Sequence, residues 1–165
     1  MTKNLFFASA AKAAFALAAA VMMSAAFTAC SSSNDEPTPP PSSKAGTVTF
    51  DGEEKPILKA EYDDNGNGNY SLYLNLSADG KEKVKIELNK DLHMTGNPVK
   101  LTEKEKTHDE KWYWVVEYYK SDGTQLINSY GAPGEDDYPV FKIGTLTASG
   151  SPESTINIKL ENGRV

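Results

Sequence analysis

Residues 63–68 read Asp-Asp-Asn-Gly-Asn-Gly, and their side-chain oxygens fall at alternate positions, as in a calcium loop. Asp63, Asn65 and Asn67 would supply the first ligands, and a glycine at the sixth position would allow the sharp turn. A bidentate glutamate normally closes the shell at the twelfth position, where this chain has Leu74. Two interpretations therefore stay open: a calcium site completed by carboxylates from elsewhere, and the favoured one, an ordinary Asn/Gly hairpin loop.

Other groups that could carry out chemistry are sparse. His93 and His108 lie in polar segments, and a zinc site would require them to converge with carboxylates, so ordinary surface histidines are expected. The sequence has no Gly-x-Ser-x-Gly elbow, and no Cys-His pair is expected, since its single cysteine, Cys30, would be acylated. We therefore predict no catalytic residues, no enzymatic activity and no cofactor.

The run 111–120 carries large aromatic side chains at positions that alternate to both faces of a strand. One face suffices for a core, and its members are Trp112, Trp114, Val116 and Tyr118. Exposed aromatic rows bind sugar rings and apolar partners, so the other face is our candidate ligand-binding surface. Its candidate residues are Tyr113, Val115 and Tyr119, with Ile127 on the next strand. An alternative stays open, in which the strand is central and the loop 103–110 covers this face.

The first 29 residues have the order of a secretion signal: a basic leader, an apolar run and small residues before Cys30. The apolar run, residues 13–27, is shorter than the ~20 residues that span a bilayer, so we expect removal of 1–29. Thr28-Ala29-Cys30 resembles a lipobox, at which bacterial lipoproteins are cleaved and the cysteine is acylated. A plain cleavage site that leaves a thiol is the alternative. Residues 30–45, rich in Ser and Pro, form a stalk.

Two segments extend the resemblance. Residues 31–36, Ser-Ser-Ser-Asn-Asp-Glu, resemble the stretch that follows the lipidated cysteine in surface-exported lipoproteins of the Bacteroidota. Residues 144–147 and 150–163 are similar to the C-terminal part of small uncharacterised lipoproteins of that group, which usually continue for another strand. The resemblance implies an outer-membrane lipoprotein exposed at the cell surface, and it implies no particular activity.

The charge balance excludes one class of partner. Lys3 and Lys12 leave with the leader and no acidic residue does, so 15 basic residues face 23 acidic ones in the mature chain, a net charge of −8. An acidic chain repels nucleic acid and anionic lipid. The only arginine is Arg164, which removes the usual means of bidentate phosphate recognition. We therefore expect no nucleic-acid binding.

Residues 46–165 form one expected domain, in which short alternating runs are separated by Asp-Gly, Asn-Gly or Pro-Gly signals. No helix is expected. The pattern predicts an antiparallel β-sandwich of about eight strands, with a lipocalin-like barrel as the alternative. The expected strands are residues 47–50, 56–62, 70–77, 83–89, 99–102, 111–120, the run after Gly123, 140–147 and 155–160.

Turn chemistry makes the register of these strands specific. A three-residue Ala78-Asp79-Gly80 loop with left-handed Gly80 would set Leu74 opposite Val84. The same logic at Ser121-Asp122-Gly123 pairs Tyr118 with Leu126. In residues 56–62, Pro56 is expected to begin the strand, with Leu58, Ala60 and Tyr62 on its inner face. Asn162-Gly163 predicts a hairpin whose return strand would lie beyond Val165, so we expect a domain truncated at its C-terminus.

These observations favour a lipid-anchored cell-envelope binding module for glycan or protein, without catalysis. The alternative is a structural or assembly lipoprotein of the cell surface. The membrane, contacted through the lipid on Cys30, is the first expected partner, and a glycan or an envelope protein is the second.

Cys30→Ser tests the anchor. Each buried methylene contributes about 0.8 kcal/mol, so two or three acyl chains hold a protein on a bilayer. We expect the variant to leave the membrane fraction while its circular dichroism spectrum stays unchanged. A variant that still sediments with membranes, together with a wild-type protein that lacks acyl mass, would contradict lipidation.

Overall fold

The computed structural model describes residues 16–24, 46–106, 110–131, 141–151 and 155–165, which form two antiparallel sheets and a single helical turn. The six-stranded sheet has the spatial order β3 (Glu53–Pro56), β2 (Thr47–Phe50), β1 (Ala16–Ser24), β11 (Thr155–Arg164), β10 (Ile143–Gly150) and β7 (Thr95–Lys100). The five-stranded sheet has the order β4 (Lys59–Asp64), β5 (Asn69–Asn75), β6 (Lys83–Asn89), β8 (Val115–Tyr119) and β9 (Gln125–Asn128).

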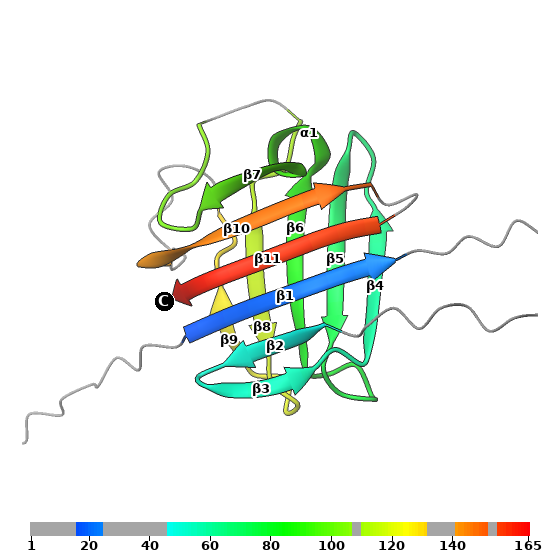
Figure 1. Ribbon diagram of the computed structural model, residues 1–165, viewed down its shortest axis with the longest axis vertical. Coiled ribbons are helices and arrows are strands. Elements are labelled where there is room, and N and C mark those ends of the chain that lie inside the picture. The colour runs from blue at the N-terminus through cyan, green and yellow to red at the C-terminus, as the bar shows by residue number, and fades with distance from the viewer. Residues whose placement is uncertain (1–15, 25–45, 107–109, 132–140, 152–154) are drawn as a thin grey trace, which may run out of the picture.

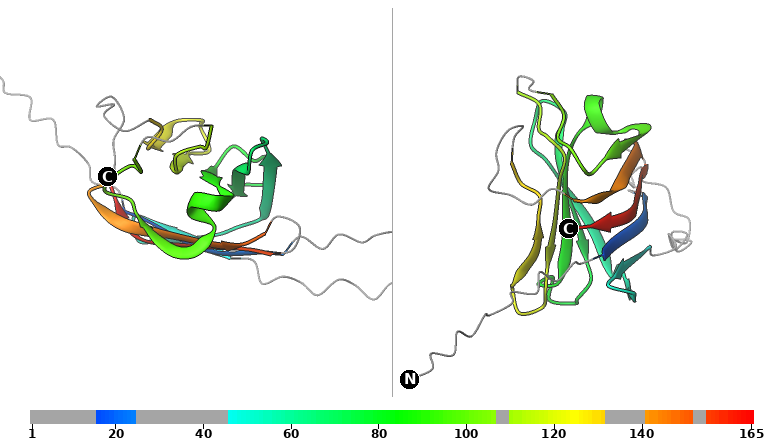
Figure 2. Two further views of the ribbon diagram at one scale, coloured as in Figure 1. Left: turned by 90° about the horizontal axis from the view of Figure 1, so that it is seen from above. Right: turned by 90° about the vertical axis from the view of Figure 1, so that its left-hand side faces the viewer.

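The two sheets face each other as two layers, and their strands cross at a steep angle (Figures 1 and 2). No strand of one sheet pairs with a strand of the other among the described residues, so the sheets do not close into a barrel. The predicted β-sandwich is confirmed and the lipocalin-like barrel is wrong. Eleven strands are described, more than the expected eight or so, partly because residues 16–24, within the predicted leader, form β1.

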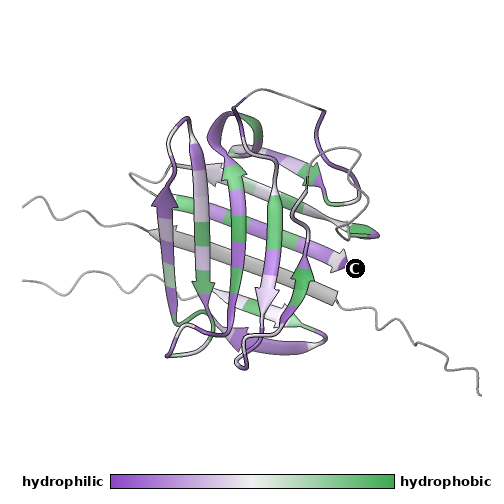
Figure 3. Ribbon diagram, turned by 180° about the vertical axis from the view of Figure 1, so that it is seen from behind, coloured by the Kyte–Doolittle hydropathy of each residue, from purple (hydrophilic) through white to green (hydrophobic). Residues whose placement is uncertain are grey.

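The core lies between the sheets because apolar and polar residues alternate along the strands, as the bands on β5, β6 and β8 show in Figure 3. Val48, Ile156, Ile158 and Leu160 point inward from the six-stranded sheet, as predicted. The largest fully buried side chains are Trp114, Tyr118, Phe141, Leu72, Leu74, Ile86, Leu88, Leu101, Ile127, Leu146 and Leu160.

The β5–β6 hairpin has the predicted register. Leu74 pairs with Val84 and Leu72 with Ile86, and Gly80 takes the left-handed conformation at φ 68°. The amide of Leu76 donates to the carbonyl of Glu82 at 2.8 Å and closes the loop. Turn chemistry therefore sufficed to place every inward residue of this pair of strands.

The β8–β9 hairpin departs from the predicted register by one residue. The turn forms as expected, with Tyr119 opposite Gln125, but a bulge follows and sets Tyr118 opposite Ile127 instead of Leu126. A one-residue slip moves a side chain to the other face of a sheet. Ile127 is therefore fully buried in the core, and its assignment to the ligand-binding surface is wrong.

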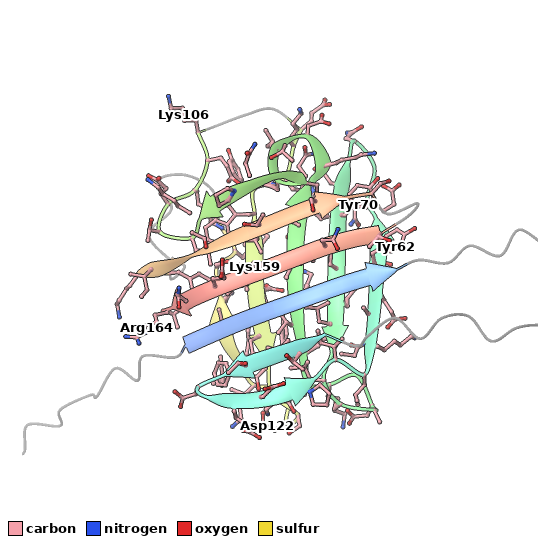
Figure 4. All side chains as sticks on the ribbon, in the orientation of Figure 1. Tyr62, Tyr70, Lys106, Asp122, Lys159 and Arg164 are labelled. Atoms are coloured by element: carbon pink, nitrogen blue, oxygen red, sulfur yellow. The ribbon has the colours of Figure 1, made fainter. Side chains whose placement is uncertain are left out.

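The run 56–62 is also divided differently from the prediction. Pro56 ends the edge strand β3 instead of beginning a strand, and Leu58 is 56% exposed. The buried residue between β3 and β4 is Ile57, whose amide donates to the carbonyl of Gly46 at 2.9 Å. Further along, Tyr62 faces inward as predicted and meets Tyr70 edge to face, with ring centroids 6.3 Å apart (Figure 4).

Asn162-Gly163 forms no hairpin turn, because β11 continues through both residues to Arg164. Asn162 is left-handed, at φ 54°, and the pairing with both β10 and β1 shifts register beside it. The same left-handed preference that favours Asn-Gly in a turn here produces a bulge within a strand.

The single helical turn α1 (Lys90–His93) was not expected. The side chain of Asn89 caps it by accepting from the amide of Asp91 at 3.1 Å. His93 is 1% exposed and not a surface residue: its Nδ1 accepts from the Asn89 amide at 2.7 Å, and its Nε2 contacts the Glu105 carboxylate. One turn is too short to show a helical period, so the sequence could not reveal it.

Tyr118 on β8 joins the two sheets at one end of the sandwich. Its ring stacks on Phe50 of β2, with centroids 4.3 Å apart. Its hydroxyl donates to Oε1 of Glu82 at 2.6 Å, and Lys55 of β3 donates to the same oxygen at 2.5 Å. Burial, together with this carboxylate, raises the pKa of Tyr118 to about 12, so the hydroxyl stays protonated as the donor.

This junction predicts acid sensitivity. Burial would raise the pKa of Glu82, but hydrogen bonds from Lys55 and Tyr118 outweigh it and hold the pKa below 4.5. Stability from a depressed carboxyl pKa is present above the unfolded pKa and is lost as pH falls through the folded pKa. We expect Glu82→Gln to cost roughly 1.5–3 kcal/mol at pH 7. The variant should also lose less of its melting temperature than wild type between pH ~5 and ~3.

Glu53→Gln is the matched control, because Glu53 lies 4.0 Å from the same Lys55 with its side chain 74% exposed. This control should melt like wild type across the pH range. If Glu82→Gln and wild type lose equal stability on acidification, the junction does not carry the acid response.

Candidate functional site

The candidate site is the outer face of the five-stranded sheet, the side turned away from β1, β10 and β11 (Figure 3). Antiparallel pairing sets polar and aromatic side chains opposite one another on this face. Lys83 is opposite Tyr119, and Lys85 is opposite Glu117 on one side and Tyr73 on the other. Three neighbouring strands, β5, β6 and β8, therefore build one surface.

One open hollow, of about 550 Å³, lies beside the start of β8 and is called the Trp112 hollow. Its aromatic walls are Trp112, Tyr113 and Tyr130, and Tyr130 is 53% exposed. Val115 forms an apolar patch, and Glu87, opposite it on β6, contributes a carboxylate. The remaining lining residues are Glu110, Lys111 and Gly131.

A second open hollow, of about 420 Å³, lies beside the end of β8 and is called the Tyr119 hollow. Lys83 stands between two rings, with Nζ 5.8 Å from the centroid of Tyr73 and 5.7 Å from that of Tyr119. Lys81, Lys85 and Gly123 complete the lining. This hollow is lined by three lysines, of which Lys81 lies 3.6 Å from Asp79 and Lys85 contacts two glutamates. The Trp112 hollow instead contains two carboxylates and one lysine.

Lys85, Glu87 and Glu117 form an ionic cluster, called the ridge, between the two hollows. Lys85 lies 2.6 Å from Glu87 and 3.4 Å from Glu117, whose side chain is only 8% exposed. Burial would lower the pKa of Lys85, but the two carboxylates outweigh it and raise that pKa. Tyr119 donates to Glu117 at 3.2 Å, and burial together with this carboxylate raises the pKa of Tyr119. Two ion pairs and a hydrogen bond thus join Lys85, Glu87, Glu117 and Tyr119 on this face.

Such a surface can hold a ligand through stacking and hydrogen bonds. Aromatic rings present flat apolar faces, and the carboxylates and lysines around them accept and donate hydrogen bonds. No described residue combines a nucleophile with a positioned base at this face, and the described residues contain no cluster of three His, Cys, Asp or Glu side chains suited to a metal ion. This arrangement of rings and charged groups fits the binding of a ligand on the outer face of the sheet.

The predicted ligand-binding residues are placed as follows. Tyr113 and Val115 line the Trp112 hollow, and Tyr119 lines the second hollow. Both tyrosines are half-buried and Val115 is 3% exposed, so the face is neither fully open nor fully covered. Ile127 does not belong to it, as described above. Whether the three remaining residues bind a ligand stays a prediction.

Trp112 was assigned to the core and instead lines the outer hollow. The expected strand 111–120 begins only at Val115, and Glu110 is left-handed at φ 58°, so strict alternation does not extend back to Trp112. The amide of Trp112 donates to the Asn69 side chain at 2.9 Å instead of to a neighbouring strand.

The loop 103–110 was the candidate cover for this face. Its Lys104 lies against Trp114 on the inner side instead, with Nζ 3.7 Å from the ring centroid and 2.6 Å from the carbonyl of Ser129. Burial lowers the pKa of Lys104 to about 8. Glu105 accepts from the Trp114 amide at 3.3 Å and contacts His93. These residues tie the loop to the core, and Glu110 alone among its described residues lines a hollow.

Asp63, Asn65 and Asn67, the calcium candidates, lie at the β4–β5 hairpin. The side-chain Nδ2 of Asn65 donates to Oγ of Ser71 at 3.2 Å, and Asn67 is left-handed at φ 54°. The backbone closes the loop through the Asn65 amide and the Asn69 carbonyl at 2.9 Å. The Asn65 side chain thus takes part in the hairpin. The acidic residues 135–137, which could complete a calcium shell, lie outside the described residues. Cys30 and His108 lie outside them as well.

No known protein family, curated protein or solved structure matches the chain. Among the described residues, no helix is long and apolar enough to cross a membrane.

The half-buried state of the two tyrosines predicts a moderate stability cost. We expect the double variant Tyr113→Ser/Tyr119→Ser to lose about 1 kcal/mol per site, because each ring has lost only part of its contact with water. Tyr118→Ser, one position away but 2% exposed, should cost roughly 3 kcal/mol or more. Chemical denaturation measures both. A double variant as unstable as Tyr118→Ser would mean that the outer face is core.

Proposed function

We propose that the chain is a lipid-anchored, non-enzymatic binding module of the cell envelope, and that its ligand is a glycan. The observation that carries the proposal is the pair of aromatic hollows on one face of the five-stranded sheet. Val115 in the first hollow and Tyr119 in the second are four residues apart on β8, about 13 Å in extended chain, which suits a ligand of more than one sugar unit. The anchor is the predicted lipid on Cys30, with residues 31–45 as a stalk that leads to the outside of the outer membrane.

The charge of the Tyr119 hollow narrows the ligand class. Three lysines line this hollow, but Lys81 lies 3.6 Å from Asp79, and Lys85 is paired with Glu87 and Glu117. Lys83, between the rings of Tyr73 and Tyr119, is therefore the lysine placed to meet an anionic group. Local positive charge on an acidic protein attracts an anionic group only at that position. We therefore assign to this hollow a sugar that carries a carboxylate or a sulfate, while the Trp112 hollow stacks a neutral ring of the same glycan.

A structural or assembly role is the second candidate function. The observation that favours it is the pairing of β1, a strand from the predicted leader, between β2 and β11. Removal of the leader would open two strand edges on the six-stranded sheet, and open edges pair with other chains. The two functions use opposite faces of the sandwich, so separate variants test them.

A glycan array followed by titration of the hits tests the first proposal. We expect Tyr113→Ala and Tyr119→Ala each to weaken binding about tenfold or more, because stacked aromatics dominate such contacts. Lys83→Ala should weaken binding of acidic glycans only, and that binding should fall with added salt. Controls on other surfaces are Leu58→Ala, 56% exposed, and Lys159→Ala on the outer side of β11 (Figure 4). Both controls should bind like wild type.

Two results would contradict the proposal. One is an array on which no glycan binds the wild-type protein, and the other is an equal loss of binding in the tyrosine variants and in the two controls.

A further inference from the structure

The six-stranded sheet is continuous only through β1. Four consecutive residues of β1, 17–20, pair with β2, and residues 16–24 pair along β11, antiparallel on both sides. β2 and β11 do not pair with each other among the described residues. The gap between them is therefore one strand wide, and its occupant comes from the segment that the sequence predicts to be removed.

On one side of the gap, β2 keeps its place through contacts that do not involve β1. β2 pairs with β3, and Phe50 of β2 stacks on Tyr118 of the opposite sheet at 4.3 Å. Lys55 of β3 reaches Glu82 at 2.5 Å, and the Ile57 amide donates to Gly46 at 2.9 Å. The hairpin of β2 and β3 is thus fixed to the five-stranded sheet by its own contacts.

On the other side of the gap, β11 pairs with β10 at seven positions, and β10 pairs in turn with β7. Ile156, Ile158 and Leu160 of β11 are buried in the core, as is Val48 on the far side of the gap. Loss of β1 would therefore expose unpaired amides and carbonyls along the edges of β2 and β11. These two edges would flank a strip of buried apolar side chains. Such an edge is a template for another strand.

The register of β1 against β11 predicts which residue types a strand in the gap needs. Positions 19, 21 and 23 of β1 are opposite the inward-facing Leu160, Ile158 and Ile156. Directly opposite residues of an antiparallel pair share one face, so these positions call for small or medium apolar residues. Position 20 is opposite Lys159, whose side chain is 61% exposed, so the alternate positions accept polar or acidic residues.

We propose that the gap between β2 and β11 is a strand-acceptor site. Residues 16–24 fill it in the unprocessed chain, and a β-strand of a partner envelope protein fills it after processing. The partner strand is antiparallel to both β2 and β11, is apolar at every second position, and is neutral or acidic at the position opposite Lys159. This proposal uses the predicted cleavage before Cys30 and is independent of glycan binding, which lies on the other sheet.

The first experiment uses the full chain, produced in the cytosol so that the leader is retained. Val21→Glu places a charge opposite Ile158 and should lower the melting temperature by roughly 10 °C. Ala20→Glu, its neighbour opposite Lys159, should melt like wild type. A synthetic peptide of residues 16–24, with two lysines at each end for solubility, should then restore the melting temperature of the Val21→Glu protein in a concentration-dependent way.

If Val21→Glu fails to fold alone, refolding in the presence of the peptide should recover folded protein, and failure to do so would overturn the proposal. Equal melting of wild type, Val21→Glu and Ala20→Glu would also overturn it, because β1 would then add nothing to the sheet.

The second experiment uses the processed, lipidated protein extracted from membranes. The wild-type peptide should bind it saturably, the Ala20→Glu peptide should bind equally, and the Val21→Glu peptide should bind about 100-fold more weakly or not at all. Three results would each overturn the proposal of a partner strand. They are residues 16–24 found still bound by mass spectrometry, a dimer that excludes the peptide, and a closed gap that binds no peptide. Tyr113→Ala should leave peptide binding unchanged, which separates this result from the glycan test.

Discussion

The pairing of β1 with both β2 and β11 is the constraint on which the six-stranded sheet depends. A sheet buries its inner face only when neighbouring strands cover the backbone groups between them, and here one central strand comes from the predicted leader. The residues predicted to act as a targeting signal therefore also occupy a sheet position, since short runs of small apolar residues satisfy both requirements. Processing would separate these roles and leave the sheet with a specific, unfilled register.

The two outer faces of the sandwich differ in chemistry because their strands differ in what they place outward. The five-stranded sheet presents tyrosines, lysines and glutamates in cross-strand pairs, with Lys85 between Glu87 and Glu117. The six-stranded sheet instead presents Asn157, Lys159 and Glu161 along β11, a polar row. A ligand that stacks on rings and a partner that adds a strand can thus use one domain without competing.

On β8, Tyr118 belongs to the core, while its two neighbours in sequence lie on the outer face. Its ring and hydroxyl join β2, β3 and β8 through Phe50, Lys55 and Glu82, while Glu117 and Tyr119 on either side face outward. The junction therefore packs directly beneath the strand that carries Tyr119. The same junction keeps the hairpin of β2 and β3 in place beside the gap.

Local sequence determined the β-sandwich, the β5–β6 register and three members of the candidate face, since alternation and left-handed Gly80 are short-range properties. Tertiary structure decided what depends on distant partners. A bulge turned Ile127 inward, irregular backbone turned Trp112 outward, and a contact with Glu105 buried His93. The Tyr119 hollow exists because β6 pairs with β8 across the intervening residues 90–114. Pairing between strands far apart in the chain leaves no local pattern, so neither this hollow nor the place of β1 could be derived from the sequence alone.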